Sequence, residues 1–171
     1  MDDFKEYDKA VIAFQKNLKI NRMPLHSWDI YGAFFSELSQ NIIDARNLEI
    51  FALENKWKSK FDFQSELNND TTIVITSPKI EIVYSSGNII KMNGYKPEEV
   101  LGKSPKMFQG EKTDTSISSQ ISKSILAALP FEHTIINYHK NGTAYDCHIK
   151  GFPVFNIKGD LCHFIAFERV A

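Results

Sequence analysis

The sequence predicts an α+β fold, in which helices lead into one five-stranded antiparallel sheet with small helices on one face. Three observations support this prediction. No glycine or proline occurs between Ala33 and Ser77, and such a stretch favours helix. Near residue 71 the apolar residues change from a spacing of three or four to a spacing of two. Two strand-like segments, several short helical pieces and three more strand-like segments then follow in order.

The N-terminal part contains two helical segments. In residues 2–19 apolar side chains recur every three or four positions, so they share one face of a helix. Pro24 interrupts this pattern, because proline lacks a backbone N–H and disfavours helix in the residue before it. The second segment covers residues 28–67, which is long for one helix of a globular domain. We therefore allow for a break near Asn41 or Asn55.

Residues 1–67 are thus predicted to form a helical extension, and residues 68–171 the domain that contains the sheet. Glycines in the loops after the third and fourth strands, Gly142 and Gly159, suit hairpin turns that need positive φ. The strands are predicted at about residues 71–76, 80–84, 133–139, 143–155 and 161–170.

Composition excludes several classes of function. The 171 residues are 43% hydrophobic, which is enough for one or at most two folded domains. Twenty lysines and arginines against 21 acidic residues give a net charge of -1, which argues against a dedicated nucleic-acid binder. No apolar stretch reaches the roughly 20 residues that span a bilayer, and the first residues are acidic. We expect no membrane association and a cytoplasmic location.

Several separated motifs after Thr71 occur in the order found in one known family. One segment reads YSSGNIIKMNGYKPEEVLGK, and the last strands read NYHKNGTAYDCHIKGFPVFNIKGDLCHFIAFERV. The first resembles the strand, helix and G-Y-x-x-E-x-x-G signature of PAS domains, and the second resembles their three closing strands. The resemblance covers about a hundred residues and implies a PAS fold for residues 68–171.

Within that family, the segment GKSPKMFQGEKTD resembles the light-oxygen-voltage (LOV) subgroup, whose flavin-facing helix reads G-x-N-C-R-F-L-Q-G-x-x-T-D. The matching residues are Gly102, Gln109, Gly110, Thr113 and Asp114. Pro105 stands where the subgroup has the cysteine that forms a thioether with the flavin, and proline has no nucleophile. Lys106 replaces the arginine that binds the flavin phosphate. The resemblance implies FMN or another flavin as a candidate cofactor, without adduct photochemistry.

The resemblance and the alternation of residues along the strands together predict a ligand pocket beneath the small helices. Its predicted residues are Val74, Thr76, Met107, Phe108, Gln109, Asn137, Cys147, Ile149, Phe164, Ala166 and Glu168. The alternative is that these side chains fill a core, because an apolar pocket and a core look alike in sequence.

Three polar positions bear on the flavin interpretation. In the LOV subgroup two asparagines and a glutamine bind the polar edge of the flavin. Asn137 matches the first asparagine, whereas Cys147 and Glu168 occupy the other two places. A thiol is a weak donor and an ionised carboxylate only accepts, so these two changes argue against flavin. An inward-facing amide and carboxylate must pair with each other or with a ligand.

Metal binding and catalysis have little support in the sequence. Cys147 and Cys162 lack C-x-x-C spacing and are interpreted as reduced, half-buried thiols. Of the strand histidines, alternation directs His148 and His163 away from the pocket, so neither metal nor haem is expected. No arrangement of nucleophile, base and orienting residue occurs, and we expect no enzyme activity.

The apolar stripe of the N-terminal helices has two interpretations. It can cover the outer face of the sheet in the same molecule, or it can pair with a second copy. We favour a homodimer through these helices, because a long helix with a drifting apolar seam buries itself more easily against a partner.

The chain ends at Ala171, directly after the last predicted strand, where family members usually continue into an effector. We therefore expect a stand-alone sensory or protein-interaction module of signal transduction. It would couple binding of a small ligand, or of an unidentified signalling partner protein, to the packing of the N-terminal helices. The alternatives are a flavin-binding redox or blue-light sensor without adduct chemistry, and a structural adaptor without a ligand.

Overall fold

The computed structural model describes residues 26–171, so the helix predicted at residues 2–19 lies outside the described residues. The chain divides after Phe35 into two units, and every contact discussed below lies within the second, Ser36–Ala171. The helices and strands are α2 (His26–Glu54), α3 (Phe63–Asn68), β1 (Thr72–Thr76), β2 (Ile82–Ser85), α4 (Ile89–Asn93), α5 (Pro97–Val100), the 3-10 helix η1 (Pro105–Phe108), α6 (Thr115–Leu126), β3 (Phe131–Tyr138), β4 (Ala144–Phe155) and β5 (Leu161–Val170).

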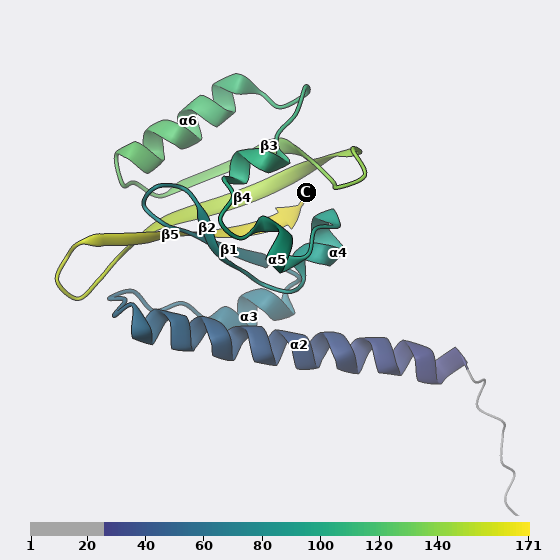
Figure 1. Cartoon of the computed structure of the whole chain (residues 1–171). Helices are drawn as coiled ribbons and strands as arrows, with labels where there is room; N and C mark the ends of the chain where they lie inside the picture. The colour runs from purple at the N-terminus through teal and green to yellow at the C-terminus, as the bar shows by residue number, and fades with distance from the viewer. Residues whose placement is uncertain (1–25) are drawn as a thin grey trace, which may run out of the picture. The chain divides into compact units, whose positions relative to one another are not determined.

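The five strands form one antiparallel sheet in the order β2-β1-β5-β4-β3, visible in Figure 1. Consecutive hairpins join β3, β4 and β5, whereas β1 pairs with β5 from the other end of the domain. Gly142 and Gly159 have φ values of 86° and 89°, as hairpin loops of this kind require. The predicted α+β fold with a five-stranded antiparallel sheet is confirmed.

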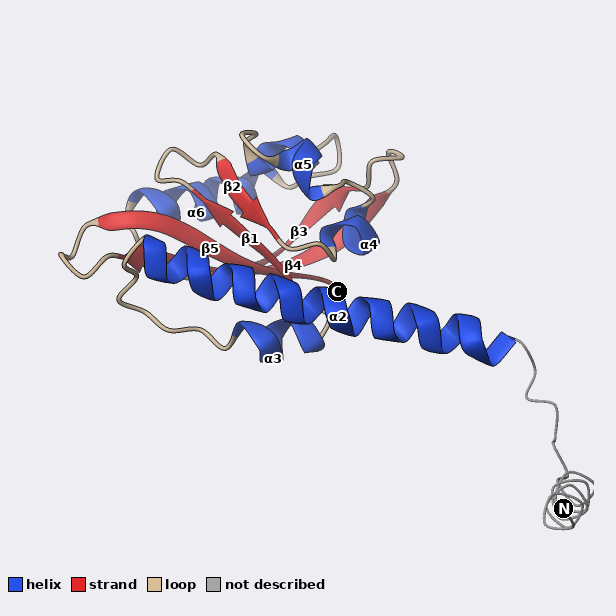
Figure 2. Cartoon of the chain, turned by 60° about the horizontal axis from the view of Figure 1, so that its bottom comes forward, coloured by secondary structure: helices blue, strands red, loops and turns tan. Residues whose placement is uncertain are grey.

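The outer face of the sheet is covered by α3 and by residues 36–54 of α2 (Figure 2). Leu48 of α2 and Leu67 of α3 are buried against Ile73 and Ile75 of β1 and Ile165 of β5. Of these five side chains none is more than 1% exposed. This apolar layer stabilises the contact between the helices and the sheet through burial of hydrocarbon surface.

α2 ends at Glu54, so the break predicted near Asn55 is present, whereas Asn41 lies within the helix. Lys56 follows with a positive φ of 53°, and Trp57 then pairs with Asn156 in an isolated bridge. The positive φ ends the helix and turns the chain back toward the sheet.

The inner face of the sheet carries α4, α5, η1 and α6 (Figure 1). Val74 and Ile82 of the sheet, Ile89 of α4, Val100 of α5 and Phe108 of η1 are all buried in one cluster on this face. Side chains of β1 point alternately to the two faces, and all five of its residues are buried. β1 therefore lies in contact with both layers of helices.

A buried carboxylate holds α2 on the sheet. Asp44 is 5% exposed, and its Oδ2 accepts a hydrogen bond from the backbone N–H of Gly87 at 2.7 Å. Its Oδ1 accepts from the Tyr84 hydroxyl at 3.3 Å and from the Gln40 amide at 3.2 Å. Burial, and to a lesser extent the charge of Asp44, raises the pKa of Tyr84, so this hydroxyl remains a donor. Asp44 thus joins α2, the end of β2 and the loop before α4.

Replacing this carboxylate should weaken the whole unit. We expect Asp44→Ala to lower the free energy of unfolding by about 2–3 kcal/mol, because the Gly87 N–H and the Tyr84 hydroxyl lose their acceptor. Urea unfolding followed by circular dichroism measures the change. The control is Glu49→Ala, an exposed position on the same helix, which should cost less than about 0.5 kcal/mol. Equal losses in the two variants would contradict the role of Asp44.

Candidate functional site

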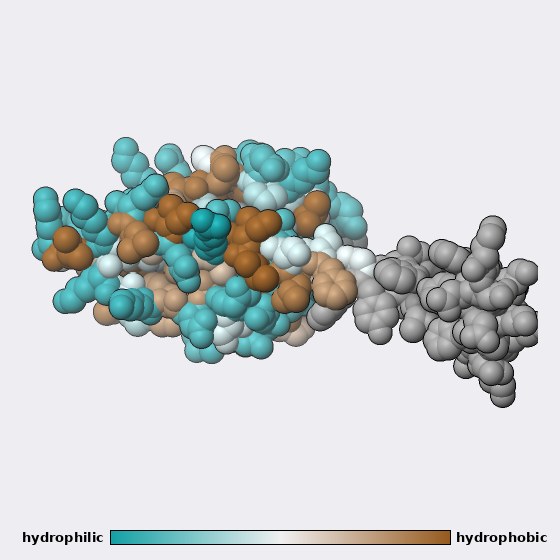
Figure 3. Space-filling model, turned by 90° about the horizontal axis from the view of Figure 1, so that it is seen from below, coloured by the Kyte–Doolittle hydropathy of each residue, from teal (hydrophilic) through white to brown (hydrophobic). Residues whose placement is uncertain are grey.

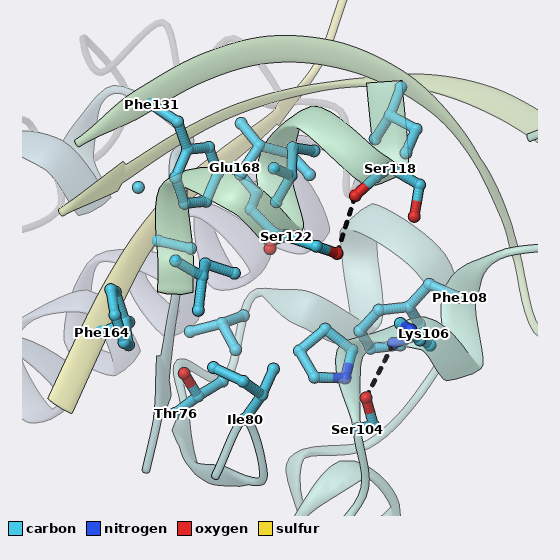
Figure 4. A pocket seen from close by; sticks show the side chains of 18 of the residues that line it. Thr76, Ile80, Ser104, Lys106, Phe108, Ser118, Ser122, Phe131, Phe164 and Glu168 are labelled. Carbon is cyan, nitrogen blue, oxygen red and sulfur yellow. Dashed lines mark hydrogen bonds between the residues drawn. The ribbon is translucent and has the colours of Figure 1, made fainter. Parts of the chain in front are cut away.

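A cavity of about 420 Å³ lies between the inner face of the sheet, α6 and η1 (Figure 4). This volume is within the range of small-molecule sites in proteins. The walls are mainly apolar, with Ile135, Phe164 and Ala166 from the sheet. Lys79 and Lys106 also line the cavity and are exposed, so they mark its solvent-facing rim. The inner face is therefore hollowed on one side of the packed cluster rather than filled throughout.

Nine of the eleven residues predicted from the sequence line this cavity. They are Val74, Thr76, Phe108, Gln109, Asn137, Ile149, Phe164, Ala166 and Glu168. Met107 and Cys147 are not among the lining residues. Cys147 is fully buried in the inner cluster, and Met107 packs against the same cluster. Both side chains belong to the packed part of the inner face. For these two positions the alternative interpretation, in which the side chains fill a core, applies.

The part of the roof that α6 forms was not predicted from the sequence, which assigned the roof to Met107, Phe108 and Gln109. α6 contributes Ser118, Ile121, Ser122 and Ile125, although none of its residues is fully buried. Isoleucines at every fourth position of this helix, starting at Ile117, are a signal for one apolar helix face that the sequence did contain. The turn residues Lys79 and Ile80 also line the cavity. No sequence pattern indicates this, because their position depends on how the β1–β2 turn folds.

Glu168 lies at the buried part of the cavity wall. The residue is 4% exposed, and its Oε2 lies 3.8 Å from the Cys147 Sγ, which donates to it. Burial raises the pKa of the Glu168 carboxyl to about 7, against a smaller lowering by the thiol. An ionised carboxylate that only accepts is therefore not the sole state of this group near pH 7. Near neutral pH a large fraction of these carboxyls is protonated, and a protonated carboxyl both donates and accepts.

Asn137 does not pair directly with Glu168. Its amide lies instead against the Cys147 thiol and the Tyr145 hydroxyl. The Tyr145 Oη and the Asn93 Nδ2 are buried and lack a hydrogen-bond partner of good geometry among the described residues. Burial raises the pKa of both Tyr145 and Cys147, so the two groups are neutral. The neutral thiol is a poor nucleophile, which agrees with its position in the core.

The lining does not fit a flavin. Neither cysteine of the chain lines the cavity, whereas Pro105 does, so the lining offers no thiol for an adduct. The Gln109 Oε1 already accepts a hydrogen bond from the Ser118 hydroxyl at 3.3 Å. Cys147, at the second asparagine position, is buried beneath the lining and cannot supply an amide. The uracil-like edge of a flavin would be left short of partners.

The strand histidines lie away from the cavity. His163 is on the outer face, where its Nδ1 accepts a hydrogen bond from the Trp57 Nε1 at 3.1 Å. His148 lies beside Glu132, with 3.1 Å between its Nε2 and the carboxylate. The prediction that these two histidines point away from the pocket is confirmed. Within residues 26–171, no group of three or more His, Cys, Asp or Glu side chains could hold a metal ion.

Comparison with known proteins identifies a family and several relatives with similar sequences. Residues 70–169 match the PAS domain family. The blue-light-activated histidine kinase of Brucella ovis is 34% identical over 99 residues, which are 56% of this chain and 20% of the kinase. Protein TWIN LOV 1 of Arabidopsis thaliana is 34% identical over 98 residues, which are 55% of this chain and 25% of that protein. The matches thus cover only a fifth to a quarter of the relatives' own lengths.

Two solved structures share the fold. The LOV domain from the blue-light-activated histidine kinase EL346 of Erythrobacter litoralis has a TM-score of 0.56 at 23% identity, covering 58% of this chain and 94% of that chain. The PAS domain from the fruit-fly ELK potassium channel also has a TM-score of 0.56 at 23% identity, covering 60% and 87%. One neighbour belongs to a light-activated kinase and the other to a channel, so the shared fold alone does not specify a ligand.

The unusual state of Glu168 should be visible in stability. The pKa of Glu168 in the folded state, about 7, exceeds the ordinary value of 4.5. The contribution of Glu168 to the free energy of unfolding is therefore complete below pH 4.5 and is lost as the pH rises through 7. The difference corresponds to about 3 kcal/mol. Relative to Glu168→Gln, the wild type should lose about that much stability between pH 4.5 and pH 8. Urea unfolding of both proteins at both pH values tests this. An equal change in the free energy of unfolding for the wild type and Glu168→Gln would contradict the burial of a protonated acid. His163 is present in both proteins, so its titration cancels.

Proposed function

The chain belongs to the PAS domain family, and from this premise we propose that it is a sensory module of signal transduction. In this proposal a small ligand occupies the cavity beneath α6, and its presence changes the packing of the N-terminal helices. The observation that supports it best is the cavity of about 420 Å³ on the inner face. The named relatives include a blue-light-activated histidine kinase, which agrees with a role in sensing.

The roof is the part of the cavity best suited to respond. α6 has no fully buried side chain, and Ser118 and Ser122 face the cavity beside Ile121. The two serines are linked, since the Ser122 hydroxyl donates to the Ser118 carbonyl at 2.9 Å, as Figure 4 shows. A helix held by so little buried surface is displaced at low cost, so ligand binding can shift its position.

Strand β1 offers a route from the cavity to the helices. Val74 lines the cavity, whereas its neighbours Ile73 and Ile75 pack on the outer face with Leu48 of α2. A ligand that displaces β1 by a fraction of an ångström would therefore alter both layers. Packed layers of this kind respond by switching between discrete arrangements.

We also propose that the module acts as a homodimer through α2. The side of α2 that faces away from the sheet exposes Ile43, Ile50 and Leu53, and Figure 3 shows apolar side chains on the face that α2 presents. Arg46 stands between them, so the four positions follow the alternating steps of three and four of a helix-pairing seam. A helix that is apolar on two opposite sides favours a second partner besides the sheet.

No helix within residues 26–171 is both long and apolar enough to cross a membrane. We propose a cytoplasmic location and a receptor role without catalysis, in which an unidentified signalling protein receives the output. A full chain that turned over a substrate would contradict this role.

Filling the cavity should abolish ligand binding. Ala166→Leu on the floor and Ser122→Leu on the roof each place a larger side chain in the cavity. The fraction of protein that carries the ligand found with the wild type should therefore fall at least tenfold in both variants. Native mass spectrometry of the purified full chain measures bound mass, and Ile157→Leu in the exposed β4–β5 loop is the control. Absence of any ligand, together with an unchanged melting temperature against a metabolite library, would favour the adaptor alternative. Visible absorbance typical of flavins would instead favour that cofactor.

Charge in the proposed seam should prevent dimerisation. We expect the double variant Ile43→Lys with Leu53→Lys to be a monomer, because four like charges would meet in the dimer. Light scattering after size-exclusion chromatography gives the mass of each species. Ile157→Lys introduces the same charge at an exposed apolar residue outside the seam and should leave the mass unchanged. A wild type that elutes as a monomer at all concentrations contradicts the dimer.

A further inference from the structure

Glu168 is a buried carboxyl group without a cationic partner. Its residue is 4% exposed, and the Cys147 thiol is the neighbour that donates to it. No lysine, arginine or histidine among residues 26–171 forms an ion pair with it. An ionised carboxylate is costly in such a place, because nothing replaces its lost hydration.

The groups around Glu168 come from three strands, and none of them is positively charged. β4 contributes Tyr145 and Cys147, both neutral, and β3 contributes the Asn137 amide. On β1 the residue opposite in the sheet is Thr72, which does not titrate. Lys79 and Lys106 line the same cavity but are exposed at its rim, and neither contacts the carboxyl. Residues 26–171 therefore supply no positive partner for Glu168, and a ligand in the cavity can supply one.

We propose that the cavity accepts a small apolar ligand that carries a basic nitrogen, an ammonium or amidinium group, which binds against the Glu168 carboxylate. This inference rests on the proposed function, since it names the class of ligand for that same cavity. Asn137 can accept a further N–H of the ligand through its amide oxygen. The apolar body would contact Phe164 and Ala166 of β5.

Binding exchanges one proton with solvent. Below a pH of about 7 the Glu168 carboxyl of the free protein mostly holds a proton, and the ligand nitrogen holds its own. When the ligand enters, the carboxyl proton passes to water and a buried ion pair forms, so charge and protons balance. A neutral ligand would gain only an ordinary hydrogen bond there, whereas a cation gains a charge-assisted bond where water is excluded. An anion would meet a carboxyl group that cannot then ionise.

Two matched series of probes test this inference. The probes are phenylalkylamines and phenylalkanols with one to five methylene groups. At each chain length the two compounds differ only in the terminal group, an amine or a hydroxyl, that would reach Glu168. Calorimetry with the full chain at pH 5.5, 6.5 and 7.5 should show amine affinity rising nearly tenfold over the first interval and about threefold over the second, as a carboxyl pKa of about 7 requires. Buffers of different ionisation enthalpy should report release of about one proton per amine at pH 5.5.

Matched variants complete the experiment. Glu168→Gln should weaken the amine at least tenfold and remove the pH dependence, whereas Glu132→Gln, an exposed position on β3, should behave as the wild type. Alcohols that bind as well as amines, or amine binding that survives in Glu168→Gln, would overturn the inference and leave the cavity's sensory role intact. If neither series binds, the inference fails, and the proposed function fails with it only when native mass spectrometry also finds no ligand. Should Glu168→Gln not fold, the pH profile of the wild type decides.

Discussion

Strand β1 is buried on both faces, and the other layers of the domain are arranged around this constraint. Its five residues alternate between the cavity side and the side covered by α2 and α3. A strand in that position cannot present a polar side to water, so helices must cover both faces of the sheet. This explains why the segment before the sheet is helical and apolar. It also means that no change at the cavity floor is confined to the inner face.

Polar contacts fix how these layers meet. Apolar burial holds α2 near the sheet without choosing a unique position, because hydrophobic contact is not directional. The hydrogen bonds that Asp44 accepts from Gly87 and Tyr84 are directional, and they favour one register of the helix on the sheet. Since Gly87 lies two residues before the start of α4, the same carboxylate connects α2 to the loop that leads into the first helix of the inner face. The outer helix is thus linked to the inner layer by two routes, through β1 and through this loop.

The sequence allowed the sheet to be predicted more completely than the cavity. Alternation and glycine-containing turns are local signals, so the strands and their hairpins followed from them. Seven of the nine predicted cavity residues lie on strands and followed because a strand residue's face depends only on its parity, whereas Phe108 and Gln109 came from the resemblance to the LOV helix. The α6 part of the roof was not predicted, because the inward face of α6 depends on how that helix lies over β3. The raised pKa of Glu168 was also not predicted, because a pKa depends on burial by several strands that no local pattern brings together.

Glu168 is the point at which this fold departs from what stability alone would select. A glutamine would make similar hydrogen bonds at the same position without a titrating group, and an apolar residue would extend the inner cluster. The chain instead keeps an acid whose burial weakens the folded state as the pH rises toward neutrality. Ionisable groups with shifted pKa values concentrate at functional sites. There the cost of burying the group is retained because a bound ligand can offset it. The acid lies at the wall of the cavity rather than in the packed cluster beside it, and a ligand can reach it there.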